Sequence, residues 1–105
     1  MKFPQCLLPF FEFKFYMIEQ CFDFDVPRVL GIYTDFRVAA KVHYKLTKAY
    51  HFEDFEQIVI HLVPCNVCLP TQKLRPQDIL VWESDRGRKY ISKSIRDKYL
   101  EWTTL

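Results

Sequence analysis

The chain has 105 residues, half of them hydrophobic and 17% aromatic, which is enough for one packed core and too apolar for a disordered segment. Its formal net charge of +2 is too small to indicate a dedicated polyanion-binding protein. Prolines interrupt the apolar residues 1–10, charges follow them, and no uncharged run approaches the ~20 apolar residues of a membrane span.

Two strands are predicted before residue 35. Residues 1–10 are expected to form an extended arm or to be poorly ordered. Residues 11–20 alternate as a strand does, with the phenylalanines and Met17 on one side. A turn at 21–27 then leads into a second strand at 28–34, antiparallel to the first. Gly31 in the second strand predicts either a β-bulge or close packing.

Residues 33–49 contain the one sustained helical period of the sequence. One side of this predicted helix is apolar and is expected to face a sheet, and the other side is basic. Thr34 or Asp35 can cap its first turn. The apolar side comprises Val38, Ala39, Val42, Leu46 and Ala49, and the opposite side comprises Arg37, Lys41, Tyr44, Lys45 and Lys48.

A third strand is predicted at 57–63, where Pro64 ends it, and residues 65–77 read as a linker or wrapping loop. A fourth strand at 78–84 is followed by a turn and by a return strand near 89–92. Ser94, with an acid three residues later, predicts the start of a short C-terminal helix whose inner face carries Ile95, Tyr99 and Trp102.

These elements predict a single α+β domain over residues 1–105. Its core is a strand–strand–helix–strand unit at 11–63, and residues 64–105 add a hairpin and the short helix. The sheet is expected to have three to five strands, with the main helix covering one face.

The run from Phe15 to Val63, in which residues 30–34 lead into a helix carrying Ala39 and Ala40, resembles a type of small uncharacterised bacterial and phage domain. The resemblance implies the same order of three strands and one helix. It covers about half of the chain, and because no activity is agreed for such domains, it implies no site residues.

Catalytic and metal-binding motifs are sparse. Cys65 and Cys68 have the spacing of a zinc-ligand pair or redox dithiol, but no second CxxC follows, so two packed thiols are the favoured interpretation. A catalytic pairing of Cys21 or Cys65 with His61 stays open, because such pairs form through the fold. No nucleophile elbow, phosphate-binding loop or HExxH motif is present. We expect no cofactor, no enzymatic activity and a cytoplasmic protein with reduced thiols.

We therefore expect a binding module that contacts another protein, or a second copy of itself through a sheet edge, since eighteen aromatic rings exceed what a small core hides easily. A phage or mobile-element inhibitor or adaptor fits this profile. Nucleic-acid binding through the basic and aromatic C-terminal region is the alternative, and a thiol or zinc protein is the third. The predicted partner-binding residues are Trp82, Arg86, Arg88, Lys89, Tyr90, Lys93, Arg37, Lys41, Tyr44 and Lys45.

Overall fold

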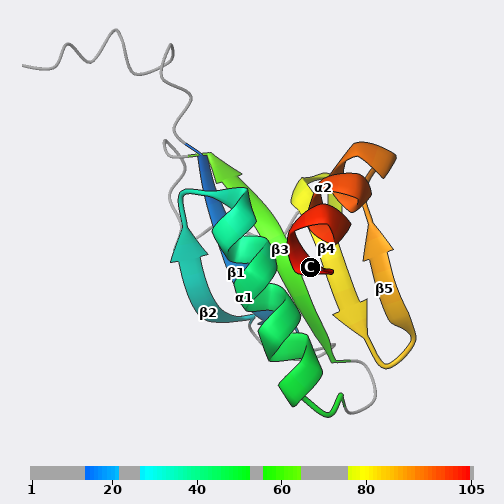
Figure 1. The fold of residues 1–105 in the computed structure, drawn as a ribbon. Helices are drawn as coiled ribbons and strands as arrows, with labels where there is room; N and C mark the ends of the chain where they lie inside the picture. The colour runs from blue at the N-terminus through cyan, green and yellow to red at the C-terminus, as the bar shows by residue number, and fades with distance from the viewer. Residues whose placement is uncertain (1–13, 22–26, 53–55, 65–75, 105) are drawn as a thin grey trace, which may run out of the picture.

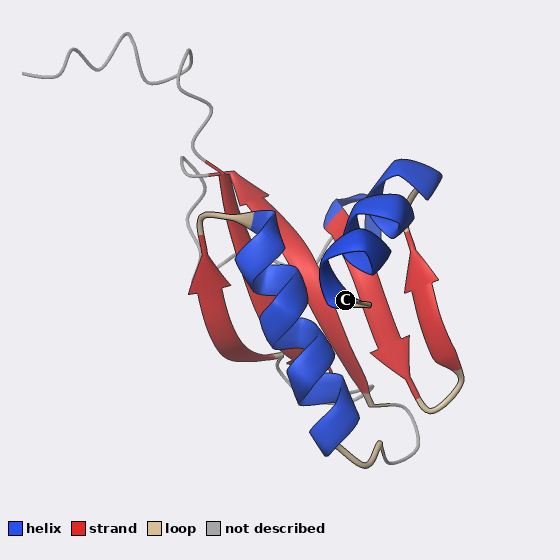
Figure 2. Cartoon of the chain, in the orientation of Figure 1, coloured by secondary structure: helices blue, strands red, loops and turns tan. Residues whose placement is uncertain are grey.

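The computed structural model describes residues 14–21, 27–52, 56–64 and 76–104. Five antiparallel strands form one open sheet in the order β2-β1-β3-β4-β5, and both helices pack on the same face of it (Figures 1 and 2). The predicted α+β class, main helix and short C-terminal helix are confirmed. The elements are β1 (Lys14–Cys21), β2 (Arg28–Tyr33), α1 (Phe36–Ala49), β3 (Gln57–Pro64), the 3₁₀ turn η3 (Pro76–Asp78), β4 (Ile79–Ser84), β5 (Gly87–Tyr90) and α2 (Lys93–Thr103).

The central strand pair is β1 with β3, which are antiparallel over their full lengths. Because β1 also pairs antiparallel with β2, strands β2 and β3 run parallel but are not neighbours, and α1 connects them across β1. On the side of the helices, Ile18 lies opposite Ile60, and Val81 of β4 continues the row. All three are fully buried, so this row is the floor of the core.

Gly31 marks an irregular place in β2, as its position in the sequence predicts. The register of β1 with β2 shifts between Ile18 and Glu19, beside this glycine. The ring of Tyr33 also folds back over Gly31, and a Cβ added there would lie 2.6 Å from the Tyr33 hydroxyl oxygen. A side chain at this position would therefore have to displace the tyrosine ring.

The buried side of α1 is rotated relative to the sequence prediction. Val38, predicted to face the sheet, is 45% exposed, whereas His43 is fully buried and Thr47 nearly so. The prediction for Val38 was wrong because both polar residues find hydrogen bonds in the interior, which removes the penalty for burying them. Thr47 donates its hydroxyl to the carbonyl of Tyr44 at 2.9 Å.

Both helices begin at side-chain caps. Asp35, one of two predicted caps, accepts a 2.9 Å hydrogen bond from the backbone N–H of Arg37. The cap of α2 is Ser92, which accepts from the N–H of Ile95 at 3.2 Å, so the start predicted at Ser94 was wrong by two residues. Ser92 has extended backbone angles and follows β5 almost at once, which leaves no room for a longer connection.

His43 joins three elements in the core. Its Nε2–H donates to the carbonyl of Ile58 in β3 at 2.9 Å, and its Nδ1 accepts from the hydroxyl of Tyr99 in α2 at 2.8 Å. Both nitrogens can be satisfied in this way only when the imidazole is neutral. Burial lowers the pKa of His43 to about 4, so the ring stays neutral at physiological pH.

Stability is therefore expected to fall in acid through His43. Because its pKa is lower in the folded chain than in the unfolded one, the unfolded chain binds more protons as the pH drops from about 6.5 toward 4. The free energy of unfolding therefore falls by up to about 3 kcal/mol as the pH drops through this range. None of this loss occurs above pH 6.5. Urea denaturation between pH 4 and 8 measures it.

The matched control is His43→Gln, whose amide can donate to Ile58 and accept from Tyr99 but does not titrate. It should be less stable than the native chain at pH 7, yet its stability should depend less steeply on pH between 4 and 6.5. Identical pH profiles for the two proteins would contradict the assignment.

Candidate functional site

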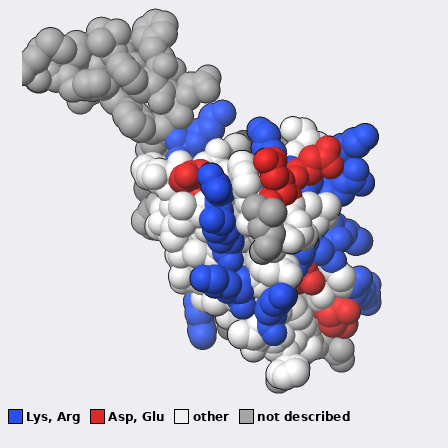
Figure 3. All heavy atoms as spheres, viewed as in Figure 1, with Lys and Arg blue, Asp and Glu red and all other residues white. Residues whose placement is uncertain are grey.

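A row of cations covers the outer side of α1. The helix contains no acid between Phe36 and Ala49. Its four exposed cations are three or four residues apart, which places them on one side of the helix over about 16 Å. Figure 3 shows Lys and Arg side chains following this helix on the face of the molecule that carries both helices. We call them the α1 basic stripe: Arg37, Lys41, Lys45 and Lys48.

Arg88 of β5 ties the C-terminal hairpin to the helices. Its guanidinium carbon lies 5.3 Å from the ring centroid of Tyr44 in α1 and 4.8 Å from that of Tyr99 in α2. It also forms an ion pair with Glu83 across the hairpin. The ammonium of Lys48 lies 4.4 Å from the Tyr44 centroid, so two cations lie close to this ring. The fold thus joins Tyr44 and Arg88, which are far apart in the sequence.

The rest of the predicted hairpin surface is divided between the two faces of the sheet. Tyr90 faces the helices and packs at 5.5 Å from Tyr99, as centroids. Trp82 and Lys89 lie opposite each other and are one residue along their strands from the Val81–Tyr90 pair. Because successive side chains of a strand alternate between the two faces, both point to the face away from the helices. Strand alternation therefore separates residues that are adjacent in the sequence. Lys93 is exposed at the start of α2, and Arg86 is exposed in the β4–β5 turn.

The surplus of aromatic rings is not displayed at the surface. Within the part of the chain that the structure describes, every aromatic side chain is buried or half-buried, and most of the rings pack against the core between the helices and the sheet. The large exposed apolar side chains are aliphatic, and three lie on the edge strand β2, where self-association through a sheet edge stays a prediction. They are Val29, Leu30, Ile32, Val38, Ile91 and Leu100.

The face of the sheet away from the helices contains a buried carboxylate–imidazole pair. Nδ1 of His61 in β3 lies 3.1 Å from Oε1 of Glu19 in β1, and both side chains are nearly inaccessible to solvent. The two residues are diagonal neighbours in the register, since Glu19 lies opposite Val59 and His61 opposite Met17. Nε2 of His61 is buried without a hydrogen-bond partner among the described atoms.

Of the three cysteines considered for thiol chemistry, Cys21 lies in the described part of the chain, at the end of β1. Cys65 and Cys68 lie outside the described residues. Cys21 lies opposite Gln57, whereas His61 lies opposite Met17. Cys21 is therefore four residues along the strands from the position of His61, or about 13 Å away. Burial, together with the nearby Glu19 charge, raises the pKa of the Cys21 thiol to about 12, which disfavours a nucleophilic thiolate. The described residues contain no cluster of three metal-ligating side chains.

A second feature of the helix-bearing face is a pocket at the start of α1. Lys98 and Trp102 of α2, Tyr16 of β1 and Phe36 of α1 are among its lining residues. Sequence reasoning did not propose this pocket, because its lining comes from distant elements. The one available signal was the helical spacing of Ile95, Tyr99 and Trp102, which indicated a packed side rather than a cavity.

Comparisons of the chain with protein-family models, with curated proteins and with solved structures gave no significant match. Among the described residues, neither helix is long and apolar enough to cross a membrane.

Breaking the Glu19–His61 pair should cost stability even though it lies away from the helices. Glu19→Leu should lower the free energy of unfolding by about 2–3 kcal/mol, because a buried imidazole loses a charge-assisted hydrogen bond. Glu19→Leu combined with His61→Leu should recover most of that loss, because no polar group is then left buried without a partner. Urea denaturation of both variants tests this, and purely additive losses would contradict it.

Proposed function

We propose that the protein is a small non-enzymatic binding module that contacts an acidic surface of another protein. The contact is made by the α1 basic stripe and by the adjoining side of the β4–β5 hairpin. The observation that supports this best is the acid-free helix with its four exposed cations on one side. Charge of one sign on one side of a helix steers an oppositely charged partner and selects against others.

The stripe is carried by a rigid support. His43 ties α1 to β3 and α2, and Phe36 stacks on Tyr16 of β1 with ring centroids 5.4 Å apart. A helix fixed at several points along its length holds its charges in a constant arrangement, so little backbone entropy is lost when a partner binds. This supports recognition of a folded or extended partner surface.

The chemical state of the reactive side chains favours binding over catalysis. Both nitrogens of His43 are engaged in structural hydrogen bonds, and its pKa is low. The Cys21 thiol is protonated at physiological pH because its pKa is raised. Neither group is prepared for acid–base or nucleophilic work near neutral pH.

The proposal predicts that reversing the stripe abolishes partner capture. The native protein, the double variant Lys41→Glu/Lys45→Glu and the control Lys93→Glu/Arg96→Glu would each be used as bait in an extract of the source cells. The control changes the same number of exposed charges on α2. A partner identified by mass spectrometry should be retained by the native protein and the control, and lost with the stripe variant.

The captured partner should then be purified and its dissociation constant measured at increasing salt. Affinity should fall as salt rises, and the stripe variant should bind at least about tenfold more weakly, as expected for the loss and reversal of two favourable charge contacts. Equal capture by the native protein and the stripe variant would exclude the α1 stripe as the binding surface.

Single-stranded nucleic acid is the second candidate, because a line of cations over about 16 Å can meet successive phosphates. Base stacking needs open aromatic faces as well, and Lys48 and Arg88 already lie against the ring of Tyr44 in the middle of this region. We therefore expect only weak oligonucleotide binding at low salt. Tight binding that falls steeply with salt and is lost in Lys41→Glu/Lys45→Glu would replace the protein partner with a nucleic acid.

A further inference from the structure

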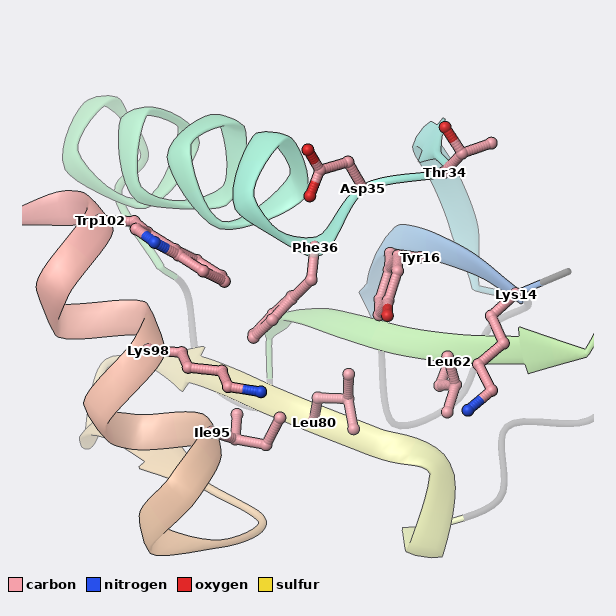
Figure 4. Close-up of a pocket in the computed structure, with 10 residues that line it drawn as sticks. All are labelled: Lys14, Tyr16, Thr34, Asp35, Phe36, Leu62, Leu80, Ile95, Lys98 and Trp102. Carbon is pink, nitrogen blue, oxygen red and sulfur yellow. The ribbon is translucent and has the colours of Figure 1, made fainter. Parts of the chain in front are cut away.

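A pocket of about 470 Å³ opens beside the first turn of α1, and this volume is in the range of sites that hold a small ligand or a large side chain. It lies between the N-terminal end of α1, the side of α2 and the sheet beneath them (Figure 4). Five elements or their flanking residues therefore contribute to it. The lining residues are Lys14, Tyr16, Thr34, Asp35, Phe36, Leu62, Leu80, Ile95, Lys98 and Trp102.

The apolar part of the pocket lining combines three aromatic and three aliphatic side chains. The rings of Tyr16 and Phe36 stack with an interplanar angle of 27°, and Trp102 meets Phe36 edge-on at a centroid distance of 5.6 Å. Tyr16 and Trp102 are only half-buried, so both rings retain surface on the pocket side. Such a surface favours a planar apolar group, which can stack on one ring and meet the edge of another.

The pocket also has a cation, Lys98, beside its apolar side chains. The side chains of Lys98 and Lys14 enter the view of Figure 4 from opposite sides, with Leu80 and Leu62 between them. The one acid of the described lining, Asp35, uses Oδ1 to cap α1 by accepting from the N–H of Arg37. A bound group that carries a negative charge beside its apolar part could pair with the ammonium of Lys98.

We infer that this pocket receives an aromatic side chain that stands next to a carboxylate in a segment of the partner protein. The inference deepens the proposed function and rests on it, because the α1 basic stripe begins at Arg37, directly after the pocket residue Phe36. An acidic segment that places its ring in the pocket can continue along the stripe. The pocket supplies an apolar anchor, and the stripe supplies charge complementarity, which together give both affinity and direction.

Four blocked pentapeptides separate the two parts of this recognition. Each peptide has two adjacent variable residues flanked by glycines. The variable residues are Phe–Asp, Phe–Asn, Ala–Asp or Ala–Asn. Binding is followed by amide chemical shifts and by the indole N–H of Trp102. The Phe–Asp peptide should bind at least about fivefold more tightly than the Phe–Asn and Ala–Asp peptides, as expected for one ion pair and one stacked ring.

Lys98→Met keeps the stem of the side chain and removes its charge, and Lys93→Met makes the same change on α2 away from the pocket. Lys98→Met should abolish the preference for Asp over Asn, whereas Lys93→Met should leave it intact. Both positions are exposed, and thermal denaturation would be used to check that both variants are folded. An unchanged preference in Lys98→Met, or shifts that lie away from residues 34–36 and 95–102, would overturn the inference.

Phenylacetate tests whether the ligand is a free aromatic acid instead of a peptide segment. It should bind more weakly than the Phe–Asp peptide, and equal or tighter binding would overturn the assignment to a protein partner's segment. The stripe is tested separately with a longer Phe–Asp peptide extended by acidic residues. If Lys98→Met weakens this peptide and Lys41→Glu/Lys45→Glu does not, the proposed use of the stripe fails while the pocket stands; the reverse result removes the pocket alone.

Discussion

The fold depends on a neutral imidazole buried where the two helices meet the sheet. His43 comes from α1, its two hydrogen bonds reach Ile58 in β3 and Tyr99 in α2, and none of the three groups has access to water. A buried polar group left without a partner costs more free energy than its hydrogen bond contributes. The arrangement therefore does more than stabilise the core: any other placement of α2 would leave the imidazole and the tyrosine hydroxyl unpaired, which selects this packing over alternatives.

The same interaction sets the distance between the main helix and the C-terminal hairpin. Tyr99 contacts His43 on one side, and Tyr90 and Arg88 of β5 on another. Arg88 in turn reaches Glu83 and the ring of Tyr44. A guanidinium that sequence reasoning placed at a partner surface is thus half-buried and is held by contacts within the protein. In contrast to Arg88, the four cations of the α1 basic stripe are exposed at the surface.

The two faces of the sheet have different chemistry. The face beneath the helices is apolar and aromatic, and around it lie the α1 basic stripe and the pocket at the start of α1. The other face contains the buried Glu19–His61 pair, and the edge strand β2 exposes aliphatic side chains. The α1 basic stripe and the pocket lie on the same side of the sheet, and the proposed contact is assigned to that side for this reason. A partner that met both features would need an acidic segment with an apolar residue near one end.

The elements and their order could be predicted from the sequence, because alternation, helical period and capping residues are local signals. The sequence identified the strands near residues 14–21 and 57–64 and the inner face of α2 through Tyr99 and Trp102, and it narrowed the cap of α1 to Thr34 or Asp35, of which the structure has Asp35. It also determined that α1 has cations on one side, which follows from residue spacing alone. Three features depended on how the elements pack: β3 lies at the centre of the sheet, His43 replaces Val38 in the core, and Lys89 and Arg88 face opposite ways relative to the helices. The pocket belongs to the second group as well. Burial of a polar side chain depends on partners supplied by other elements, and a cavity lined by residues 14 to 102 exists only once those elements are packed together.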